Sequence, residues 1–314
     1  MKTALQHLHI LQGRYHLLRG ICRSGRRAKY YGVVVLLAVA FPFIVHAQPS
    51  GMTARQMVEI IKQKIGVPWQ ETTVDVFKAG NPDNVVTGVV TTMFPTMTIL
   101  KKAVASGKNF IIVHEPAFYN HLDETSEFEK NNDPVYLDKI RYINDHNLII
   151  WRFHDHWHMR KPDGILEGMT RALGWEDYRK DNAEGIFIIP PVTLQQLQGM
   201  LAEKLHASHI RLVGDPSMKI TQVGFLPGAV GSDLQMEFLR RDDVEVLLVG
   251  ESSEWETIEY VRDASLQGKK KALVVIGHIP SEEEGMKECA RWIKTLFPEV
   301  NVSFIPSNEP FSEK

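Results

Sequence analysis

The ten residues "WRFHDHWHMR", positions 151–160, place three histidines and an aspartate within five positions, directly after the apolar run "NLIIW". Imidazole and carboxylate groups transfer protons near neutral pH, and both bind divalent metals. His154, His156 and His158 would share one face of an extended segment, whereas only His154 and His158 would share a face of a helix. The cluster therefore predicts proton transfer or metal binding at the end of a buried strand.

Three further apolar runs also end in residues that can carry a proton or bind a metal. "NFIIVHE" ends in His114 and Glu115, "VEVLLVGE" ends in Glu251, and "KALVVIGH" ends in His278. In open α/β sheets, sites form beyond the carboxyl ends of the strands, so residues far apart in sequence can meet there. One such histidine is usually only a hydrogen-bonded loop residue. Polar groups at the ends of four apolar strands, however, are costly to half-bury without a partner such as a metal.

The local spacings also favour metal binding. In "GHIPSEEEG", His278 and Glu282 lie four apart across a strand-to-helix turn, for which Ser281 is the expected N-cap. In "HEP", His114 and Glu115 would point to opposite sides of an extended strand end, which suits two ions better than one. Nitrogen and carboxylate ligands without thiolate favour Zn, Mn or Fe. The histidines expected on loops or helix surfaces, outside the site, are His121, His146, His206 and His209.

The segments around these residues alternate between short apolar runs and helical patterns. Apolar spacing predicts a helix over 53–66 with Thr53 as its N-cap, another over 164–174, and a third that Thr193 caps. Strands that alternate with helices indicate an α/β fold with largely parallel sheets flanked by helices. We expect three consecutive parts: residues 48–180 as the N-terminal part of the metal-binding fold, 181–222 as an inserted middle segment, and 223–314 as the C-terminal part that completes it.

The first 47 residues resemble a secretory signal peptide. They contain seven basic and no acidic residues, followed by "GVVVLLAVAFPFIV" and the cleavage pattern "VHA", so we expect cleavage after Ala47 and a periplasmic or extracellular protein. The apolar run of roughly 14 residues is shorter than the ~20 of a permanent span, and an uncleaved anchor is the alternative. Removing these seven basic residues from 36 leaves 29 against 38 acidic ones, a formal net charge of −9. An acidic chain of this kind argues against a nucleic-acid partner.

Other chemistries find little support in the sequence. Cys289 is the only cysteine after the leader, so it can form neither an intramolecular disulfide nor a thiolate metal site, and we expect it to be buried in a helix. There is no P-loop and no Gly-x-Gly-x-x-Gly after a strand to hold a phosphate. Gly228 and Gly231 in "LPGAVGSDL" could approach a ligand, but a tight turn is the expected role.

Several segments together resemble the NGG-interacting-factor-three-like (Nif-three-like) family of dinuclear metal-centre proteins. They are "NFIIVHEPAFY", "FHDHWH" with "GILEGMTRALGW", "ITQVGFLPGAVGSDL", "VEVLLVGES" and "VIGHIPSEEEGMKECARWI", in the family's order and from about Thr53 to Phe311. The resemblance implies a two-lobed α/β fold, two metal ions per subunit and a hexameric ring. Many members of the family are labelled homologues of a GTP cyclohydrolase.

Two positions depart from the family's ligand pattern. Its His-His-Pro falls on residues 114–116, where the second position is Glu115, and its His-x-x-x-Asp falls on residues 154–158, where the last position is His158. The two departures look reciprocal, because three nitrogens and two carboxylates are retained. The metal ligands that the resemblance implies are His114, Glu115, His158, His278 and Glu282.

These observations predict an exported divalent-metal-binding protein, with a metal-dependent hydrolase as the leading hypothesis. Two ions held by nitrogen and oxygen ligands can orient a substrate and activate water. Glu251 and His154 lie at the same sheet edge, so they are the candidate proton carriers. We expect a small-molecule substrate, no permanent membrane span after cleavage, and a homo-oligomer. The alternative is a non-catalytic metal-binding or scaffold protein with an altered metal site.

Overall fold

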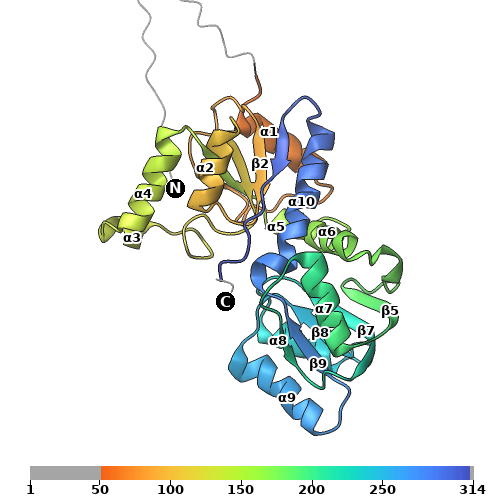
Figure 1. Cartoon of the computed structure of the whole chain (residues 1–314). Coiled ribbons are helices and arrows are strands. Elements are labelled where there is room, and N and C mark those ends of the chain that lie inside the picture. Colours follow the sequence, from red (N-terminus) through yellow and green to blue (C-terminus); the bar gives the residue numbers. More distant parts are fainter. Residues whose placement is uncertain (1–50, 312–314) are drawn as a thin grey trace, which may run out of the picture. The chain divides into compact units, whose positions relative to one another are not determined.

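The computed structural model describes residues 51–311 and contains two five-stranded sheets with flanking helices (Figure 1). The predicted signal peptide, residues 1–47, lies outside the described residues. Within the described residues, no helix combines the length and the apolar character needed to cross a membrane. The α/β fold class predicted from the sequence is confirmed.

The first sheet has the strand order β1-β4-β3-β2-β10. Its strands are parallel except for β1, which pairs antiparallel with β4 at one edge. β10 comes from the end of the chain and lies beside β2. The strands are β1 Phe77–Ala79, β2 Val89–Thr92, β3 Phe110–Val113, β4 Ile149–Arg152 and β10 Val302–Phe304.

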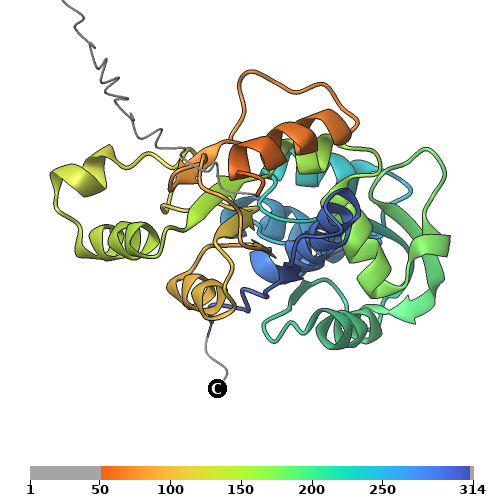
Figure 2. The same cartoon turned by 90° about the horizontal axis from the view of Figure 1, so that it is seen from above.

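Helices cover both faces of the first sheet, so β2, β3 and β4 are buried at every position. Successive residues of a strand point to opposite faces. Ile111 therefore belongs to the cluster formed with α2 and α4, whereas Ile112 belongs to the core that includes α1. Figure 2 shows α1 and α2 on opposite sides of this sheet. The helices are α1 Ala54–Lys64, α2 Met97–Ala105, α3 Ser126–Lys130 and α4 Pro134–Asp145.

The second sheet has the strand order β5-β7-β8-β9-β6. Its three central strands are parallel, and both edge strands are antiparallel to their neighbours. Residues 181–222, the expected middle segment, contain β5, α7, β6 and the first half of β7, so the expected boundary at residue 222 falls within a strand of this sheet. The strands are β5 Ile186–Thr193, β6 Arg211–Val213, β7 Lys219–Leu226, β8 Val246–Val249 and β9 Ala272–Val275.

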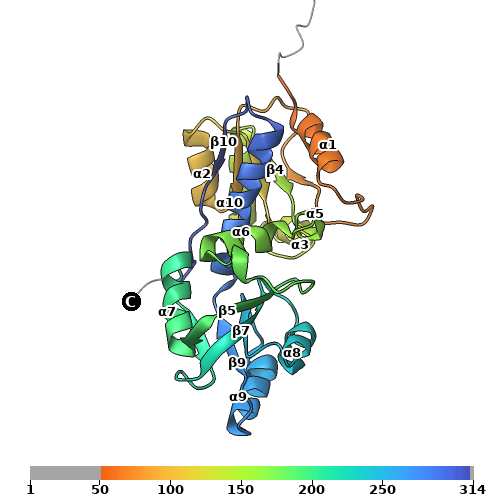
Figure 3. The same ribbon diagram turned by 90° about the vertical axis from the view of Figure 1, so that its right-hand side faces the viewer.

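The second sheet is also covered on both faces. Leu247 packs in a cluster with residues of α8 and α9, whereas Leu248 packs in the main core with residues of α7. Figure 3 shows α7 and α8 on opposite sides of this sheet. The elements here are η1 Glu176–Tyr178, α7 Leu194–Leu205, α8 Ser232–Arg240, the π-helix η2 Glu254–Ile258 and α9 Glu259–Leu266.

Two packed helices, α6 (Gly164–Leu173) and α10 (His278–Leu296), connect the cores of the two sheets. Their backbones approach closely through Gly168 and Gly285. A Cβ on Gly168 would lie 2.4 Å from the carbonyl oxygen of Glu284, so a larger residue would force the helices apart. This packing fixes the start of α10, where two of the predicted metal ligands lie.

Several local predictions can be compared with the structure directly. Thr53 and Thr193 are confirmed as N-caps, each within a capping box. Cys289 is confirmed as a buried residue of α10, and burial raises the pKa of its thiol. The prediction for Ser281 is wrong: α10 begins at His278 after Gly277, so Ser281 lies inside the helix.

Candidate metal centre

The carboxyl ends of β3 and β4 in the first sheet meet the start of α10. His114 and Glu115 directly follow β3, and His154 follows β4 after one intervening residue. α10 supplies two more side chains from its first turns. The structure thus brings together all five predicted metal ligands and His154 (listed here as His114, Glu115, His154, His158, His278 and Glu282).

The segment "HDHWH" is helical rather than extended. α5 spans Asp155–Met159, and His154 is the residue immediately before it. His154 and His158 therefore lie on the same side, with ring centroids 5.0 Å apart. His156 points elsewhere: it is fully buried, stacks on Trp69 at 3.6 Å, and accepts a hydrogen bond from the backbone N–H of Gln70. Two of the three histidines face the centre, and the third anchors the helix.

The carboxylate of Asp75 holds the beginning of α5. Its Oδ1 accepts hydrogen bonds from the backbone N–H groups of His154 at 2.6 Å and Asp155 at 2.9 Å. Its Oδ2 accepts from the backbone N–H of His156 at 2.9 Å and from Nδ1 of the same residue at 2.7 Å. A buried carboxylate at a helix start satisfies N–H groups that have no partner within the helix. Asp75 therefore fixes where His154 and His158 point, a role that the sequence did not reveal.

The ligand-type atoms lie close to one another. Nε2 of His114 and Nε2 of His158 are 3.2 Å apart. Nε2 of His278 lies 3.0 Å from Oε1 of Glu115 and 3.1 Å from Oε2 of Glu282. In two groups, the candidate ligand atoms all lie within 4.8 Å of one another, close enough to hold an ion. One group is His114 with His154 and His158, and the other is His114 with Glu115 and Glu282.

All four imidazoles of the centre use Nδ1 in the same way. Nδ1 of His114 lies 3.3 Å from the carbonyl oxygen of Phe153, and the other three pair with carboxylates: His154 with Asp155 at 2.9 Å, His158 with Asp163 at 2.8 Å, and His278 with Glu251 at 2.7 Å. These oxygens can only accept, so Nδ1 carries the hydrogen and a neutral ring keeps its lone pair on Nε2. Metal-bound histidines are commonly oriented by this kind of hydrogen bond.

Two further observations show that the residues fit a divalent ion. The Nε2 atoms of His114 and His158 face each other, so the lone pairs of two neutral rings would repel there unless a proton or a metal ion lies between or beside them. Oε2 of Glu282 is buried without a hydrogen-bond partner, although Nε2 of His278 is 3.1 Å away. Ligand atoms on one ion at 2.0–2.2 Å lie about 3 to 3.5 Å from one another, which matches these separations. Nitrogen and carboxylate donors suit Zn, Mn or Fe.

The charges of the centre perturb each other strongly. Burial lowers the pKa of His278, but hydrogen bonds to Glu115 and Glu251 and the nearby charge of Glu282 outweigh it and raise the pKa to about 12. Burial likewise opposes protonation of His158, yet Asp163 and Glu282 help raise its pKa to about 9. Without a metal, the protons of these rings neutralise the carboxylates.

The pKa values of three other members of the centre, His114, Glu115 and Glu282, are lowered. The pKa of His114 is lowered by burial and by the nearby charge of His154. Burial raises the pKa of Glu115, but its hydrogen bond to His278 and the charge of His114 bring the pKa down to about 2. Glu282, fully buried among the same imidazoles, has a pKa well below the usual value. Both carboxylates are therefore ionised, as metal ligands must be.

A buried arginine, Arg152, supports Glu115 from behind. Its Nε donates to the carbonyl oxygen of His114, Nη1 donates to that of His121, and Nη2 lies 3.3 Å from Oε2 of Glu115. One carboxylate oxygen of Glu115 is thus committed to Arg152, and the other, Oε1, faces His278 at 3.0 Å. The sequence carries no local signal for this role of Arg152.

The expected geometry of the "HEP" segment is wrong. His114 and Glu115 do not serve opposite sides, because β3 ends at Val113 and the two residues lie in a bend. Both side chains reach one cluster with Glu282. The alternation of a strand does not extend to the residues that follow it.

Close backbone packing positions Glu282. Gly228 has φ +73°, and a Cβ there would lie 2.3 Å from Oε1 of Glu282. The backbone N–H of Gly228 donates to Oγ of Ser281 at 3.0 Å, and this hydroxyl donates to the carbonyl oxygen of His278. Gly228 lies in a bend rather than in a hydrogen-bonded turn, and its missing side chain leaves room for the Glu282 carboxylate.

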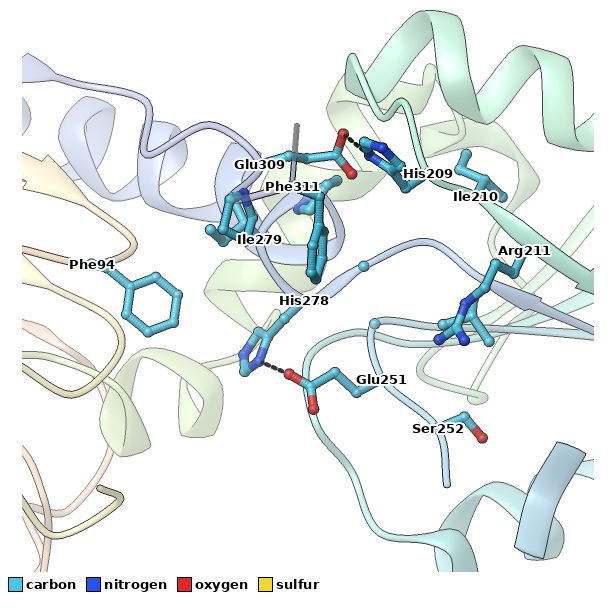
Figure 4. Close-up of a pocket in the computed structure, with 15 residues that line it drawn as sticks. Phe94, His209, Ile210, Arg211, Glu251, Ser252, His278, Ile279, Glu309 and Phe311 are labelled. Carbon is cyan, nitrogen blue, oxygen red and sulfur yellow. Dashed lines mark hydrogen bonds and ion pairs between the residues drawn. The ribbon is translucent and has the colours of Figure 1, made fainter. Parts of the chain in front are cut away.

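The two predicted proton carriers do not lie at one sheet edge, as the sequence suggested, because His154 follows β4 of the first sheet and Glu251 follows β8 of the second. His154 lies within one ligand group, with its side chain 23% exposed. Glu251 lies behind His278, and its side chain is 59% exposed and borders a cavity (Figure 4). His146 and His206 are exposed and His121 contributes a carbonyl oxygen, while His209 lines the same cavity as Glu251.

Fold and centre together define an α/β protein with a candidate metal centre of histidine and glutamate. The profile of one family, described as Duf34/NIF3 (NGG1p interacting factor 3), matches residues 52–310. Because this match covers most of the chain, the protein belongs to the Duf34/NIF3 family. The family resemblance seen in the sequence is confirmed.

Solved structures share the fold at low sequence identity. The crystal structure of Staphylococcus aureus protein SA1388 has a TM-score of 0.64 at 17% identity, over 84% of this chain and 99% of that one. A Bacillus cereus protein related to NIF3 has a TM-score of 0.63 at 14% identity, over 84% and 99%. Reduced HcgD from Methanocaldococcus jannaschii has 0.56 at 15%, over 82% and 98%. No curated protein matches the chain.

Proposed function

We propose that the protein is an exported, divalent-metal-dependent hydrolase with a dinuclear centre. The observation that supports this most is the common orientation of four imidazoles, each with Nδ1 on an oxygen and Nε2 directed toward Glu115 or Glu282. Proteins use such hydrogen bonds to aim imidazole lone pairs at a metal. The two ligand groups share Nε2 of His114, which can bind one ion, so a second ion would be held by the other members of the cluster together with His278; Zn, Mn or Fe are the candidates.

The chain's own residues account for positioning and proton transfer. A bound divalent ion would supply Lewis acidity toward a substrate oxygen. Glu251 has a half-exposed carboxylate beside the cavity, and it can take a proton there while it holds Nδ1 of His278. His154, oriented by Asp155, presents Nε2 4.0 Å from Oε1 of Glu115 and is the second proton carrier.

The alternative is a metal-binding or scaffold protein without turnover. The buried ion pair between Arg152 and Glu115 favours it, because the pair gives Glu115 a structural role that needs no substrate. Metal binding and turnover must therefore be measured separately.

Metal analysis tests the first half of the proposal. Purified protein is stripped with a chelator, dialysed against Zn, Mn or Fe(II), and measured for metal per chain by mass spectrometry. Wild type should retain up to two ions, and His114→Ala should lose at least one of them, because Nε2 of His114 belongs to both ligand groups. His146→Ala is the matched control, since His146 is exposed and outside the centre. Equal metal content in all three proteins would rule out the centre.

A substrate panel tests the second half. Esters, amides and phosphate esters are incubated with the metal-loaded wild type, with Glu251→Gln and with Glu259→Gln as an exposed control. Turnover that needs metal and falls at least ten-fold in Glu251→Gln supports the hydrolase. Metal binding with no turnover on any substrate favours the scaffold alternative.

Export and assembly are separate parts of the proposal. The acid-free leader supports cleavage near Ala47, and N-terminal sequencing of the protein from its native host decides it. An intact leader on a cytoplasmic species would overturn export. Family membership supports a homo-oligomer, with six subunits expected. Light scattering of metal-loaded protein over a range of concentrations would contradict this if it gave the mass of one chain throughout.

A further inference from the structure

A cavity of about 820 Å³ lies beside the candidate metal centre, at the carboxyl ends of β8 and β9 (Figure 4). His278 and Glu251 border it, so the cavity and the centre are continuous. A volume of this size fits a whole small molecule. We propose that it is a subsite for the flat apolar or aromatic group of a substrate, an inference that rests on the proposed function of the centre.

Aromatic side chains from two distant segments form the walls of the cavity. Phe94 follows β2 of the first sheet, and Phe311 comes from the C-terminal segment. Figure 4 shows the two rings on either side of His278. The aliphatic side chains of Val275 and Ile279 add to the same lining. Rings gain free energy by stacking on such surfaces, beyond the burial of apolar area.

The polar side chains of the walls are already paired within the protein. Nδ1 of His209 lies 3.3 Å from Oε2 of Glu309, and Nη1 of Arg211 donates to Oε1 of Glu254 at 2.6 Å. Among the described residues that line the cavity, Arg211 is the one with a permanent positive charge. The surface left for recognition is therefore mainly apolar, which favours a ring over a sugar or a polyphosphate.

The position of Phe94 also limits how the substrate is built. Its ring centroid lies 6.0 Å from that of His278, a candidate ligand. A substrate whose ring contacts Phe94 can therefore reach the centre with a group that is only one or two bonds away from that ring. The geometry points to a small molecule whose ring is attached almost directly to its oxygen-bearing reacting group.

Calorimetric titration with 2-naphthol tests the subsite without the metal. The probe has a flat ring and is added to chelator-treated wild type, Phe94→Ala, Phe311→Ala and the control Leu266→Ala. Phe311 is 66% exposed and Leu266 is 79% exposed, so neither substitution should disturb the core. Each phenylalanine variant should weaken binding about three- to ten-fold, whereas Leu266→Ala should not. Wild-type affinity in both phenylalanine variants would overturn the proposal.

A second titration asks whether ring and centre act together. On Zn-loaded wild type, 2-naphthohydroxamate should bind at least ten-fold more tightly than acetohydroxamate, which has the same chelating group without the ring. This ratio should fall in Phe311→Ala. Equal affinities of the two hydroxamates would refute a ring subsite beside the centre. If Zn strengthens neither hydroxamate while 2-naphthol still depends on the phenylalanines, the metal function fails and the aromatic subsite stands.

Discussion

Oδ1 of Asp75 accepts a hydrogen bond of 2.6 Å from the backbone N–H of His154, and the same carboxylate binds the ring of His156 at 2.7 Å. A residue that precedes the first strand of the sheet thus fixes the loop that follows β4. Because His154 and His158 both belong to this loop, their aim depends on a carboxylate that does not face the centre.

Asp75→Asn should therefore weaken metal binding about 10- to 100-fold, the usual effect of losing a supporting residue. The amide nitrogen cannot accept, so at least one of four donors loses its partner. Competition with a chromophoric chelator measures the affinity, and circular dichroism checks the fold. Asp83→Asn is the control, since Asp83 lies in an exposed pair with Arg55. Unchanged affinity in a folded Asp75→Asn protein would contradict the prediction.

Glu115 and His158 are expected to be direct ligands, so each single alanine variant should lose metal. The two departures from the family pattern keep three nitrogens and two carboxylates, and thus the ligand charge. Metal per chain is measured for Glu115→Ala, His158→Ala and His278→Ala. Full occupancy in the first two, with loss only in His278→Ala, would show that Glu115 and His158 are not ligands.

The double variant Glu115→His with His158→Asp restores the family pattern, but we expect it to be less stable than wild type. Nη2 of Arg152 lies 3.3 Å from Oε2 of Glu115, and Arg152 is fully buried. Loss of this carboxylate leaves Arg152 with two carbonyl oxygens and with Asp123, whose Oδ2 lies 3.8 Å from Nη1, so we expect a cost of about 1 to 3 kcal/mol. Urea unfolding measures the free energy. A double variant as stable as wild type would show that Arg152 does not need Glu115.

The sequence predicted the meeting of the strand ends for a general reason. Parallel strands within one sheet place their carboxyl ends at one edge, which explains why His114 lies near His154 in the first sheet and Glu251 near His278 in the second. A single common edge is wrong, because β8 and β9 belong to the second sheet, and the start of α10 brings His278 to the first. Capping signals at Thr53 and Thr193 are equally local, and both predictions are confirmed.

The supporting residues could not be predicted, because their roles depend on tertiary contacts. Asp75 lies about 80 positions before the backbone groups that it binds, and Arg152 reads as an ordinary strand residue. The start of α10 was misplaced because Gly277, with φ +104°, begins the helix without a side-chain cap. A short polar residue such as Ser281 is an N-cap signal only where the preceding turn is known.

Gly228→Ala should lower metal affinity at least ten-fold by displacing Glu282. A Cβ at this position would lie 2.3 Å from Oε1 of Glu282, and φ of +73° is unfavourable for alanine. Gly231→Ala is the matched control three residues later, because its φ is −63° and no atom lies within 4 Å of the added carbon. Metal titration of both variants decides the matter. Equal affinities would mean that Glu282 adapts or does not bind the metal.

The buried Lys139 provides a pH-dependent prediction away from the centre. Its side chain is 4% exposed, and Nζ donates to the carbonyl oxygen of Ala117 at 2.6 Å. Burial lowers the pKa to about 8 from the ordinary 10.5, although the charge of Asp123 opposes the shift. The folded protein therefore releases this proton at lower pH than the unfolded chain does.

Stability should accordingly rise with pH between about 8 and 10.5, because the unfolded state binds more protons there. The penalty of burying a charged amine is fully present below pH 8 and is relieved above pH 10.5, by about 3 kcal/mol. Lys139→Met lacks the group, so the difference in unfolding free energy between wild type and variant isolates it from other titrating residues. Urea unfolding at pH 7, 8, 9 and 10.5 measures this difference, which should shift in favour of wild type as the pH rises. Lys130→Met, at an exposed position, should show a constant difference. A difference that stays constant or falls for Lys139→Met would show that burial does not lower the pKa of Lys139 in the folded protein.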